Sequence, residues 1–458
     1  MSRHAAVILA AGKGTRMKSR LPKVLHRVCG KEMVSLVAET ARKAGFEQAT
    51  VVIAPEHQAV RDSLGASVTY AVQSEQRGTG HALLQARAAT NGADHLALMY
   101  GDVPLIRAET LRGLMELHTD SRAAVTVLTA LVPDPHGLGR IVRNDAGGIT
   151  RIVEEADADE KTKAVREINT GLYCFDAAWM WPVLEALKPS RSGEIYLTDL
   201  IEEACRQRRI VASMAAADVQ EVQGVNTRVQ LAEAEAALGK RIRERWMLAG
   251  VTMIDPASVY IDFDIEIGAD TIIHPNTHIR GKTKIGSDCE IGPNSIIENA
   301  TIGDRCKIKA SAMENSTMES DSDLGPFGHV RPGSHIESHV HLGNYAEVSR
   351  SRIGSGTKMG HMSFMGDARV GKNVNIGAGT ITTNYDGIRK HITIIEDDVK
   401  LGCDTMLVAP VTLGARSMTG AGAVVTKDVG PYTVAVGLPA KPFPKRTTPK
   451  ECPEWCKH

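Results

Sequence analysis

The sequence lacks an excess of either charge, and it lacks a long apolar run. Lys and Arg together number 54, Asp and Glu also number 54, and the formal net charge is therefore zero. A protein that binds nucleic acid or an anionic membrane normally carries a basic excess, so neither partner is favoured. No apolar run approaches the length of a membrane span, and the N-terminus lacks the apolar core of a signal peptide. We therefore expect a cytosolic (cytoplasmic) protein without membrane insertion.

The cysteines also lack the spacing of a disulfide framework or of a strong zinc site. The eight of them are scattered, at positions 29, 174, 205, 289, 306, 403, 452 and 456. Cys452, Cys456 and His458 form a group near the C-terminus, but a fourth ligand is missing. We interpret that group as a frayed tail. At 458 residues the chain exceeds one core, so we expect two domains.

Near the N-terminus, a glycine-rich turn is combined with two spaced cations. An apolar run ending at Leu9 leads into Ala10-Ala11-Gly12-Lys13-Gly14, and Arg16 and Lys23 follow. Glycine lets the backbone approach a ligand, and its N–H groups can bind phosphate oxygens. The spacing differs from that of a P-loop, and Met17 stands where a dinucleotide fingerprint needs Gly or Ala. A bare strand-to-helix turn would leave the cations unexplained, so we expect a triphosphate site.

Up to about residue 226, apolar strand-like runs alternate with helical patterns. This alternation predicts a mostly parallel sheet covered on both faces, with ligands bound at the carboxyl ends of its strands. The candidate strands are residues 5–9, 50–54, 95–100 and 124–130, and the candidate helices are residues 34–44, 108–118 and 197–206.

Residues 228–247 have apolar side chains at spacings of three and four, with charged residues between them. The pattern predicts one amphipathic helix that links two halves of the chain. We therefore expect a first domain at residues 1–227, a linking helix at 228–248 and a second domain at 249–458.

After Ile254 an aliphatic residue followed by glycine recurs at multiples of six residues. Ile267-Gly268, Ile285-Gly286 and Ile291-Gly292 are examples. A six-residue period is typical of a parallel β-helix, in which each hexapeptide forms a short strand and a turn. The low aromatic content, 4% of residues, fits an interior too narrow for large rings. Irregular insertions interrupt the period near residues 300–322 and 380–395.

These segments carry a resemblance to known enzymes. The N-terminal LAAGKGTRM with Leu21-Pro22-Lys23 resembles the sugar-phosphate nucleotidyltransferases, and the hexapeptide pattern resembles acyltransferases that form trimers. Together, up to about residue 430, they resemble the bifunctional N-acetylglucosamine-1-phosphate uridyltransferase and glucosamine-1-phosphate N-acetyltransferase family. Further matching segments are QRGTGHA, YGDVP, EINTG, GVNTR, HVRPG, LGNYAEV, NVNIGAGTITTNYDG and LVAPVT.

The resemblance implies a fold, a set of substrates and an oligomer. The expected fold is a Rossmann-like α/β nucleotidyltransferase domain, a linking helix and a left-handed parallel β-helix. The expected small-molecule partners are UTP, N-acetylglucosamine-1-phosphate, glucosamine-1-phosphate and acetyl-CoA, with Mg²⁺ as cofactor. The expected oligomer is a homotrimer with acetyl-transfer sites between neighbouring β-helices.

The resemblance also assigns residues to the nucleotidyl-transfer site. Residues 9–12 would hold the nucleotide, Arg16 and Lys23 would contact its phosphates, and Asp102 with Asn226 would bind Mg²⁺, which takes few oxygen ligands beside phosphates and water. The remaining matches are Gln73, Gly78 and Thr79 for the uracil, Tyr100 and Gly101 before the metal ligand, and Gly139, Glu154 and Asn169 for the amino sugar. Taken alone, Asp102 could equally cap a turn and Asn226 the linking helix.

In the second half, the resemblance singles out His361 as the base for acetyl transfer, because histidine titrates in the useful range. The matches for the sugar phosphate are Arg331, Ser349, Phe364 and Asn375; those for acetyl-CoA and the orientation of the reacting groups are Ala378, Asn384, Tyr385, Cys403 and Ala421.

The chain departs from the family at two of these positions. The family has a lysine where Ser349 stands and a tyrosine where Phe364 stands, so we expect weaker binding of the sugar phosphate. Because alternate strand residues face opposite sides, we expect neither Arg350 nor Arg352 to point where Ser349 points. The C-terminal segment beyond residue 430 also differs from that of the family. Lys441, Lys445 and Arg446 are candidates to bind the phosphates of CoA. These departures leave an alternative open: a uridyltransferase whose β-helix acylates another acceptor or only trimerises the chain.

Overall fold

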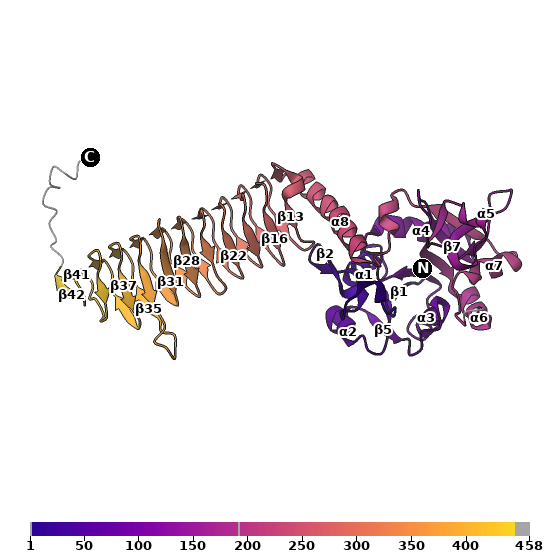
Figure 1. Ribbon diagram of the computed structural model, residues 1–458, viewed down its shortest axis with the longest axis horizontal. Coiled ribbons are helices and arrows are strands. Elements are labelled where there is room, and N and C mark those ends of the chain that lie inside the picture. The colour runs from indigo at the N-terminus through magenta and orange to yellow at the C-terminus, as the bar shows by residue number, and fades with distance from the viewer. Residues whose placement is uncertain (1, 191–192, 445–458) are drawn as a thin grey trace. The chain divides into compact units, whose positions relative to one another are not determined.

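A computed structural model describes residues 2–190 and 193–444 of the chain. The chain divides into two compact units between Leu238 and Gly239. Figure 1 shows an α/β arrangement in the first unit and stacked coils of short strands in the second. In the described part of the chain, no helix has the length and apolar character needed to cross a membrane.

The first unit is built on a nine-stranded sheet with the order β11-β7-β10-β6-β1-β4-β5, and β8 and β9 extend it beside β10. Strand β1 pairs in parallel with both β4 and β6, whereas β10 runs antiparallel between β6 and β7. The strands are β1 His4–Leu9, β4 Gln48–Ile53, β5 Thr69–Val72, β6 His95–Tyr100, β7 Val125–Leu131, β8 Arg140–Arg143, β9 Ile149–Val153, β10 Glu167–Asp176 and β11 Val211–Ala215; β2 Arg27–Val28 and β3 Lys31–Glu32 form a separate hairpin.

Helices cover both faces of this sheet. Alternate residues of β1 enter two different hydrophobic clusters, with Ala6 and Ile8 in one and Val7 and Leu9 in the other. A strand that is buried on both sides has a nearly continuous run of apolar side chains, and β1 has such a run after its first residue, His4. The helices are α1 Met33–Lys43, α2 Gln58–Leu64, α3 Thr79–Gln85, α4 Ala108–Ser121, α5 Glu160–Lys163, α6 Ala177–Ala186, α7 Asp199–Arg206 and α8 Arg228–Leu248.

The strands and helices expected from the sequence are all present, with ends that differ by at most three residues. The mostly parallel sheet is confirmed, but the antiparallel β10 and the β8–β9 hairpin were not foreseen. Strand β10 is difficult to recognise because its pairing with β7 is interrupted between Asn169 and Tyr173, where Gly171 has φ 81°.

The second unit is a three-sided parallel β-helix, whose three sheets we call faces 1, 2 and 3. Face 1 contains β12 Thr252–Met253, β15 Ile272–Ile273, β18 Glu290–Ile291, β21 Lys307–Ile308, β24 Asp323–Leu324, β27 His341–Leu342, β30 Lys358–Met359, β33 Asn375–Ile376, β36 Lys400–Leu401, β39 Met418–Thr419, β41 Thr433–Val436 and the antiparallel β42 Lys441–Pro444.

Faces 2 and 3 complete each coil. Face 2 contains β13 Tyr260–Ile261, β16 His278–Arg280, β19 Ile296–Glu298, β22 Ala312–Glu314, β25 His329–Val330, β28 Ala346–Ser349, β31 Ser363–Gly366, β34 Ile381–Thr383, β37 Met406–Val408 and β40 Val424–Val425. Face 3 contains β14 Glu266–Ile267, β17 Lys284–Ile285, β20 Thr301–Ile302, β23 Thr317–Met318, β26 His335–Ile336, β29 Arg352–Ile353, β32 Ala368–Val370, β35 Thr393–Ile395 and β38 Val411–Leu413.

The hexapeptide period has a direct structural cause. Its aliphatic residues point inward and stack coil upon coil, and Ile273, Ile291 and Ile308 are each fully buried. Ile273 pairs with Ile291, 18 residues later, so one coil takes three hexapeptides. Near residues 300–322 the expected insertion is wrong, because the coils shorten and Thr301 pairs with Thr317. Near residues 380–395 an inserted loop does separate β34 from β35.

Candidate functional sites

A cavity of about 1070 Å³ opens at the carboxyl ends of β1 and β6 in the first unit. Most of the residues expected to bind the nucleotide sugar line it. They are Leu9, Ala10, Ala11, Gly12, Lys23, Gln73, Gly78, Thr79, Tyr100, Asp102, Gly139, Glu154, Asn169 and Asn226. Arg16 and Gly101 are not among the lining residues: Arg16 is exposed on a short 3₁₀ turn, and Gly101 is buried against Val24.

The glycine-rich turn leaves space for a ligand and is held in place by side chains from elsewhere. A Cβ added at Gly12 would meet no atom within 4 Å. Gln76 donates its side-chain N–H to the carbonyl oxygen of Ala11 at 2.7 Å, and a ring nitrogen of His57 lies 3.3 Å from the carbonyl oxygen of Ala10. Gln76 lines the cavity, but sequence reasoning did not single it out.

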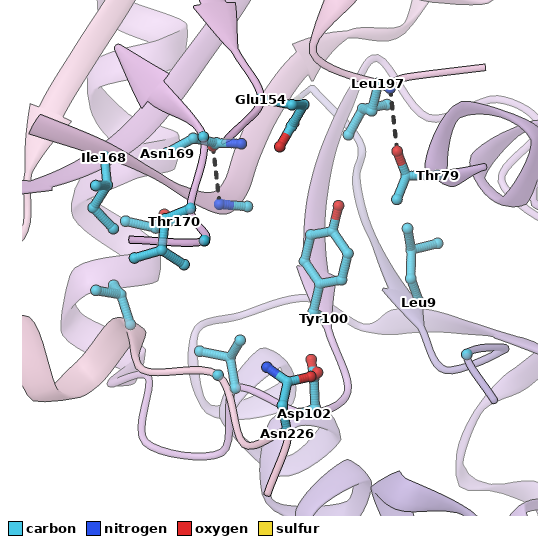
Figure 2. A pocket seen from close by; sticks show the side chains of 18 of the residues that line it. Leu9, Thr79, Tyr100, Asp102, Glu154, Ile168, Asn169, Thr170, Leu197 and Asn226 are labelled. Atoms are coloured by element: carbon cyan, nitrogen blue, oxygen red, sulfur yellow. Dashed lines mark hydrogen bonds between the residues drawn. The ribbon is translucent and has the colours of Figure 1, made fainter. Parts of the chain in front are cut away.

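Asp102 and Asn226 meet around a positive charge, and they lie side by side in Figure 2. The Lys23 ammonium donates to Asp102 Oδ2 and, at 2.9 Å, to Asn226 Oδ1. Thr227 rather than Asn226 caps α8, because the Thr227 hydroxyl accepts from the backbone N–H of Gln230 at 3.2 Å while the Gln230 side chain accepts from the backbone N–H of Thr227 at 3.1 Å. The side chain of Asn226 therefore faces the cavity instead of capping the helix.

Gln73, Gly78 and Thr79 also come together. The Gln73 side chain is 4% exposed and donates to the carbonyl oxygen of Gly78 at 3.2 Å. Gly78 has φ 98°, and a Cβ there would lie 2.6 Å from the carbonyl oxygen of Ile195, so no other residue fits this close approach. The Thr79 hydroxyl accepts from the backbone N–H of Leu197 at 3.2 Å (Figure 2), which fixes the start of α3 against the cavity wall.

The residues expected to hold the amino sugar lie together in the cavity wall. Gly139 accepts from the backbone N–H of Asn169 at 2.8 Å, and a Cβ at Gly139 would lie 3.3 Å from Glu154 Oε2. The Asn169 side-chain oxygen accepts from the Tyr173 hydroxyl at 2.8 Å and the Gly171 N–H at 3.0 Å, which leaves its NH₂ group to donate. Burial raises the pKa of Glu154.

In the β-helix, four of the expected acetyl-transfer residues form a column at the corner between faces 1 and 2. Residues on consecutive coils are joined there by backbone hydrogen bonds: Met362 accepts from Gly379, Ala378 from Asp404 and Cys403 from Gly422, at 2.6, 2.7 and 2.8 Å. The column consists of His361, Ala378, Cys403 and Ala421, of which Ala378 is half-buried and the other three are exposed.

A second group lies along face 2 and its corner with face 3. Arg331 donates its backbone N–H to Val348 at 2.8 Å, which places it beside Ser349 on the next coil. A Cβ at Gly366 would lie 2.5 Å from the Phe364 ring and 2.9 Å from the Asn384 side-chain nitrogen, so the ring covers Gly366 next to Asn384. Asn375 lies apart on β33 of face 1, and Tyr385 is 59% exposed in the loop after β34.

The expectation that Arg350 points away from Ser349 is wrong. Arg350 donates through Nη1 to the Ser349 hydroxyl at 3.1 Å and through Nε and Nη2 to Asp367 at 2.7 and 2.8 Å. Strand alternation does not apply, because β28 ends at Ser349 and Arg350 has φ 49° in the corner. Arg352 does lie on β29 of face 3 and pairs with Glu337 at 2.7 Å.

Two comparisons with known proteins, one with family models and one with curated proteins, agree with this architecture. Residues 6–171 match the MobA-like NTP transferase domain, residues 264–299 and 282–313 match the bacterial transferase hexapeptide, and residues 392–427 match the hexapeptide repeat of succinyl-transferase. The chain is 49% identical to the curated "Bifunctional protein GlmU" of Heliobacterium modesticaldum over 95% of this chain and 96% of that one. It is 48% identical to the protein of the same name from Brevibacillus brevis, with 95% of each chain covered.

The chain belongs to the bifunctional GlmU family. The relatives match it across both units, so the resemblance noted from the sequence is confirmed. Within residues 2–190 and 193–444, no group of three or more His, Cys, Asp or Glu side chains is placed to hold a metal ion. Lys445, Arg446 and the Cys452, Cys456 and His458 group lie outside the described residues.

Proposed function

We propose that this protein makes UDP-N-acetylglucosamine by two group transfers. The first moves the acetyl group of acetyl-CoA to glucosamine-1-phosphate, and the second moves the uridylyl group of UTP to N-acetylglucosamine-1-phosphate with release of pyrophosphate. The observation that carries the proposal is the cavity of the first unit, in which a glycine-rich turn, Lys23, Asp102 and the expected sugar-binding residues converge. Bifunctional relatives matching 95% of the chain favour this function over a β-helix that only trimerises.

The uridylyl transfer needs positioning and charge neutralisation but no general base. A phosphate oxygen of the sugar phosphate, already ionised at neutral pH, attacks the α-phosphorus of UTP in line, and pyrophosphate leaves. Gln73, Gly78 and Thr79 hold the uracil, and Gly139, Glu154 and Asn169 hold the sugar. Lys23 and Arg16 offset the charge that builds up on the phosphates.

Asp102 and Asn226 fit a divalent cation, because their oxygens already share one positive charge, the Lys23 ammonium. A carboxylate and an amide oxygen, completed by phosphate oxygens and water, suit Mg²⁺. Bound there, Mg²⁺ supplies further charge neutralisation to the phosphates. Phosphate oxygens would also give Lys23 new partners, so it can leave Asp102 and Asn226 to the metal.

The acetyl transfer requires a base. We assign this role to His361, which takes a proton from the amino group as its nitrogen attacks the thioester carbonyl. The tetrahedral intermediate then collapses, the C–S bond breaks, and His361 returns the proton to the sulfur, so that CoA leaves as a thiol. Ala378, Cys403 and Ala421 lie on the coils that follow His361 at the same corner and would line the bound acetyl-CoA. Because this corner is exposed in a single chain, we propose that a homotrimer completes the site.

Each proposed activity belongs to one domain. The nucleotidyltransferase comprises residues 1–227, the linking helix residues 228–248 and the acetyltransferase residues 249–458. The first turns of α8 also contribute to the first unit, since the Glu235 carboxylate accepts from the backbone N–H of Cys29 at 2.7 Å. A fragment meant to carry uridyltransferase activity alone should therefore extend to Leu238.

The test supplies the full chain with glucosamine-1-phosphate, acetyl-CoA, UTP and Mg²⁺, and follows thiol release and pyrophosphate release separately. Both products should form, and pyrophosphate release should depend on prior acetyl transfer and stop with a chelator. Thiol release without pyrophosphate, or pyrophosphate release alone when N-acetylglucosamine-1-phosphate is supplied, would remove one of the two proposed activities.

A further inference from the structure

Two arginines flank a buried serine on face 2 of the β-helix. Ser349 ends β28 and is 1% exposed. Arg331 lies beside it on the preceding coil, and Arg350 follows it in the chain and donates to its hydroxyl at 3.1 Å. Both arginine side chains are nearly half exposed. The surface above Ser349 therefore offers two guanidinium groups, although Ser349 itself carries no charge.

An arginine–aspartate pair between consecutive coils is not by itself a sign of function. Arg305 binds Asp321 through Nε and Nη2 at 2.7 and 2.8 Å, with the bond lengths that join Arg350 to Asp367. Arg305 and Arg350 also share a positive φ, 56° and 49°. At both corners the bidentate pair ties one coil to the next. The Arg305–Asp321 pair therefore serves as a reference for a purely structural pair in this β-helix.

The pair at Arg350 differs from that reference in two ways. Arg350 makes a third contact, to Ser349, and Asp367 also accepts from the side-chain N–H of Asn384. Asp367 is correspondingly less exposed than Asp321, 16% against 30%. One carboxylate thus holds both a guanidinium and an amide that belong to the group expected to bind the sugar phosphate. The three contacts of Arg350 use three of its five N–H donors, which leaves two for a ligand.

We propose that Arg350 binds the phosphate of the amino-sugar substrate, and that Asp367 is a positioning residue that holds Arg350 and Asn384 in place. A guanidinium fork matches the oxygens of a phosphate, and a fork already held by a carboxylate loses less freedom on binding. Because the Asn384 nitrogen is committed to Asp367, its amide oxygen is the end that can accept from the substrate amine. The proposal rests on the acetyl transfer to glucosamine-1-phosphate proposed above.

The test compares Arg350→Gln with Arg305→Gln in the full chain. Both variants lose a bidentate pair, so both should show a similar small loss of thermal stability. Only Arg350→Gln should raise the KM for glucosamine-1-phosphate, by roughly tenfold or more, since it removes a charge-assisted hydrogen bond to the phosphate. The KM for acetyl-CoA should not change. With glucosamine, which has no phosphate, the kcat/KM of Arg350→Gln should equal that of the parent chain.

A second measurement does not depend on the acetylation of glucosamine. Inorganic phosphate should inhibit acetyl transfer competitively with the sugar phosphate, and Arg350→Gln should weaken that inhibition while Arg305→Gln leaves it unchanged. Asp367→Asn should raise the KM for glucosamine-1-phosphate less than Arg350→Gln does, because the cation remains.

Three outcomes would overturn the proposal: an unchanged KM in Arg350→Gln, an equal loss with both acceptors, or an equal loss in Arg305→Gln. Absence of acetyl transfer in the parent chain would instead refute the function on which the proposal rests.

Discussion

In the turn after β1, a Cβ added at Gly12 would meet no atom within 4 Å, whereas in the β-helix a Cβ added at Gly343 would lie 2.1 Å from the carbonyl oxygen of Gly360. The space beside Gly12 is open to the cavity in which we propose that the nucleotide binds, and the space beside Gly343 is filled by the next coil. Gly12 belongs to a glycine-rich turn and Gly343 to the hexapeptide repeat, and the sequence shows both patterns clearly. Glycine therefore leaves open space at the cavity in the first unit, whereas in the β-helix it allows one coil to stack closely on the next.

The two candidate sites also differ in how the fold brings their residues together. In the α/β unit, residues as distant in sequence as Lys23 and Asn226 converge on one cavity within a single chain. In the β-helix, most of the expected residues recur on consecutive coils along a corner and a face, where His361, Cys403 and Ala421 are exposed and Ser349 is buried. A sheet with crossover helices brings distant residues to one edge, but a solenoid can only repeat neighbours.

The largest effect is expected from filling the space between two coils. Gly343→Ala should destabilise the β-helix by about 3 kcal/mol, because its Cβ would press on a backbone oxygen that cannot move without shifting a coil. Gly360→Ala is the matched control, since its Cβ would meet only the His341 side chain at 3.8 Å. Calorimetry of the full chain measures both, and the transition that UTP does not raise belongs to the β-helix. Equal stability of the two variants would contradict the stacking role.

Lowering the pH should destabilise the first unit but not the β-helix through a buried histidine. The expected change in unfolding free energy is smaller than that of Gly343→Ala. His118 is fully buried in the first unit, and burial lowers its pKa to about 4. Because this value lies below that of an unfolded histidine, the unfolded chain takes up the proton first, and stability is lost as the pH falls from about 6.5 towards 4. The β-helix histidines His335 and His341 are instead nearly half exposed and paired with carboxylates.

Between pH 7 and pH 4.5 the first unit should therefore lose roughly 2 kcal/mol through His118. The measurement is the calorimetric transition that UTP raises, recorded at both pH values for the parent chain and for His118→Gln. The variant should show a correspondingly smaller difference between the two pH values. An identical difference in both proteins would show that His118 is not the responsible group.

The smallest effect is expected where the glycine leaves open space. Gly12→Ala should raise the KM for UTP by roughly tenfold, about 1.4 kcal/mol, because its Cβ would enter the volume kept for the nucleotide. Stability should not change. Gly113→Ala is the control, since Gly113 lies in α4 and its Cβ would meet only the Met214 sulfur at 3.7 Å. A lower thermal stability of Gly12→Ala with an unchanged KM would place Gly12 among the packing glycines.

The sequence predicts the parts of the molecule that depend on local periodicity or on motifs. The hexapeptide period identifies the β-helix because each inward residue stacks on its counterpart one coil later, as Ile273 does on Ile291. The glycine-rich turn is recognisable because its cations are close to it in sequence. By contrast, Gln76 supports this turn through a contact across 65 positions, which no local pattern records.

Arg350 shows a different limit of sequence reasoning. Its direction depends on where β28 ends, and one residue decides whether strand alternation applies. The sequence marks Ser349 as a departure from the family but does not show that the neighbouring residue turns back towards it. The direction of the Arg350 side chain could therefore not be predicted from the sequence, because it depends on the backbone conformation at the corner.

The most direct test of the account assays both transfers in two variants of the full chain, Asp102→Ala and His361→Ala. Asp102 lies in the first unit and His361 in the second, so the two proposed sites are separate. Asp102→Ala should lose pyrophosphate release by on the order of 100-fold or more while thiol release continues, and His361→Ala should show the reverse. Loss of both reactions in either variant with the fold retained, or loss of neither reaction, would show that the chain does not carry two independent transfer sites.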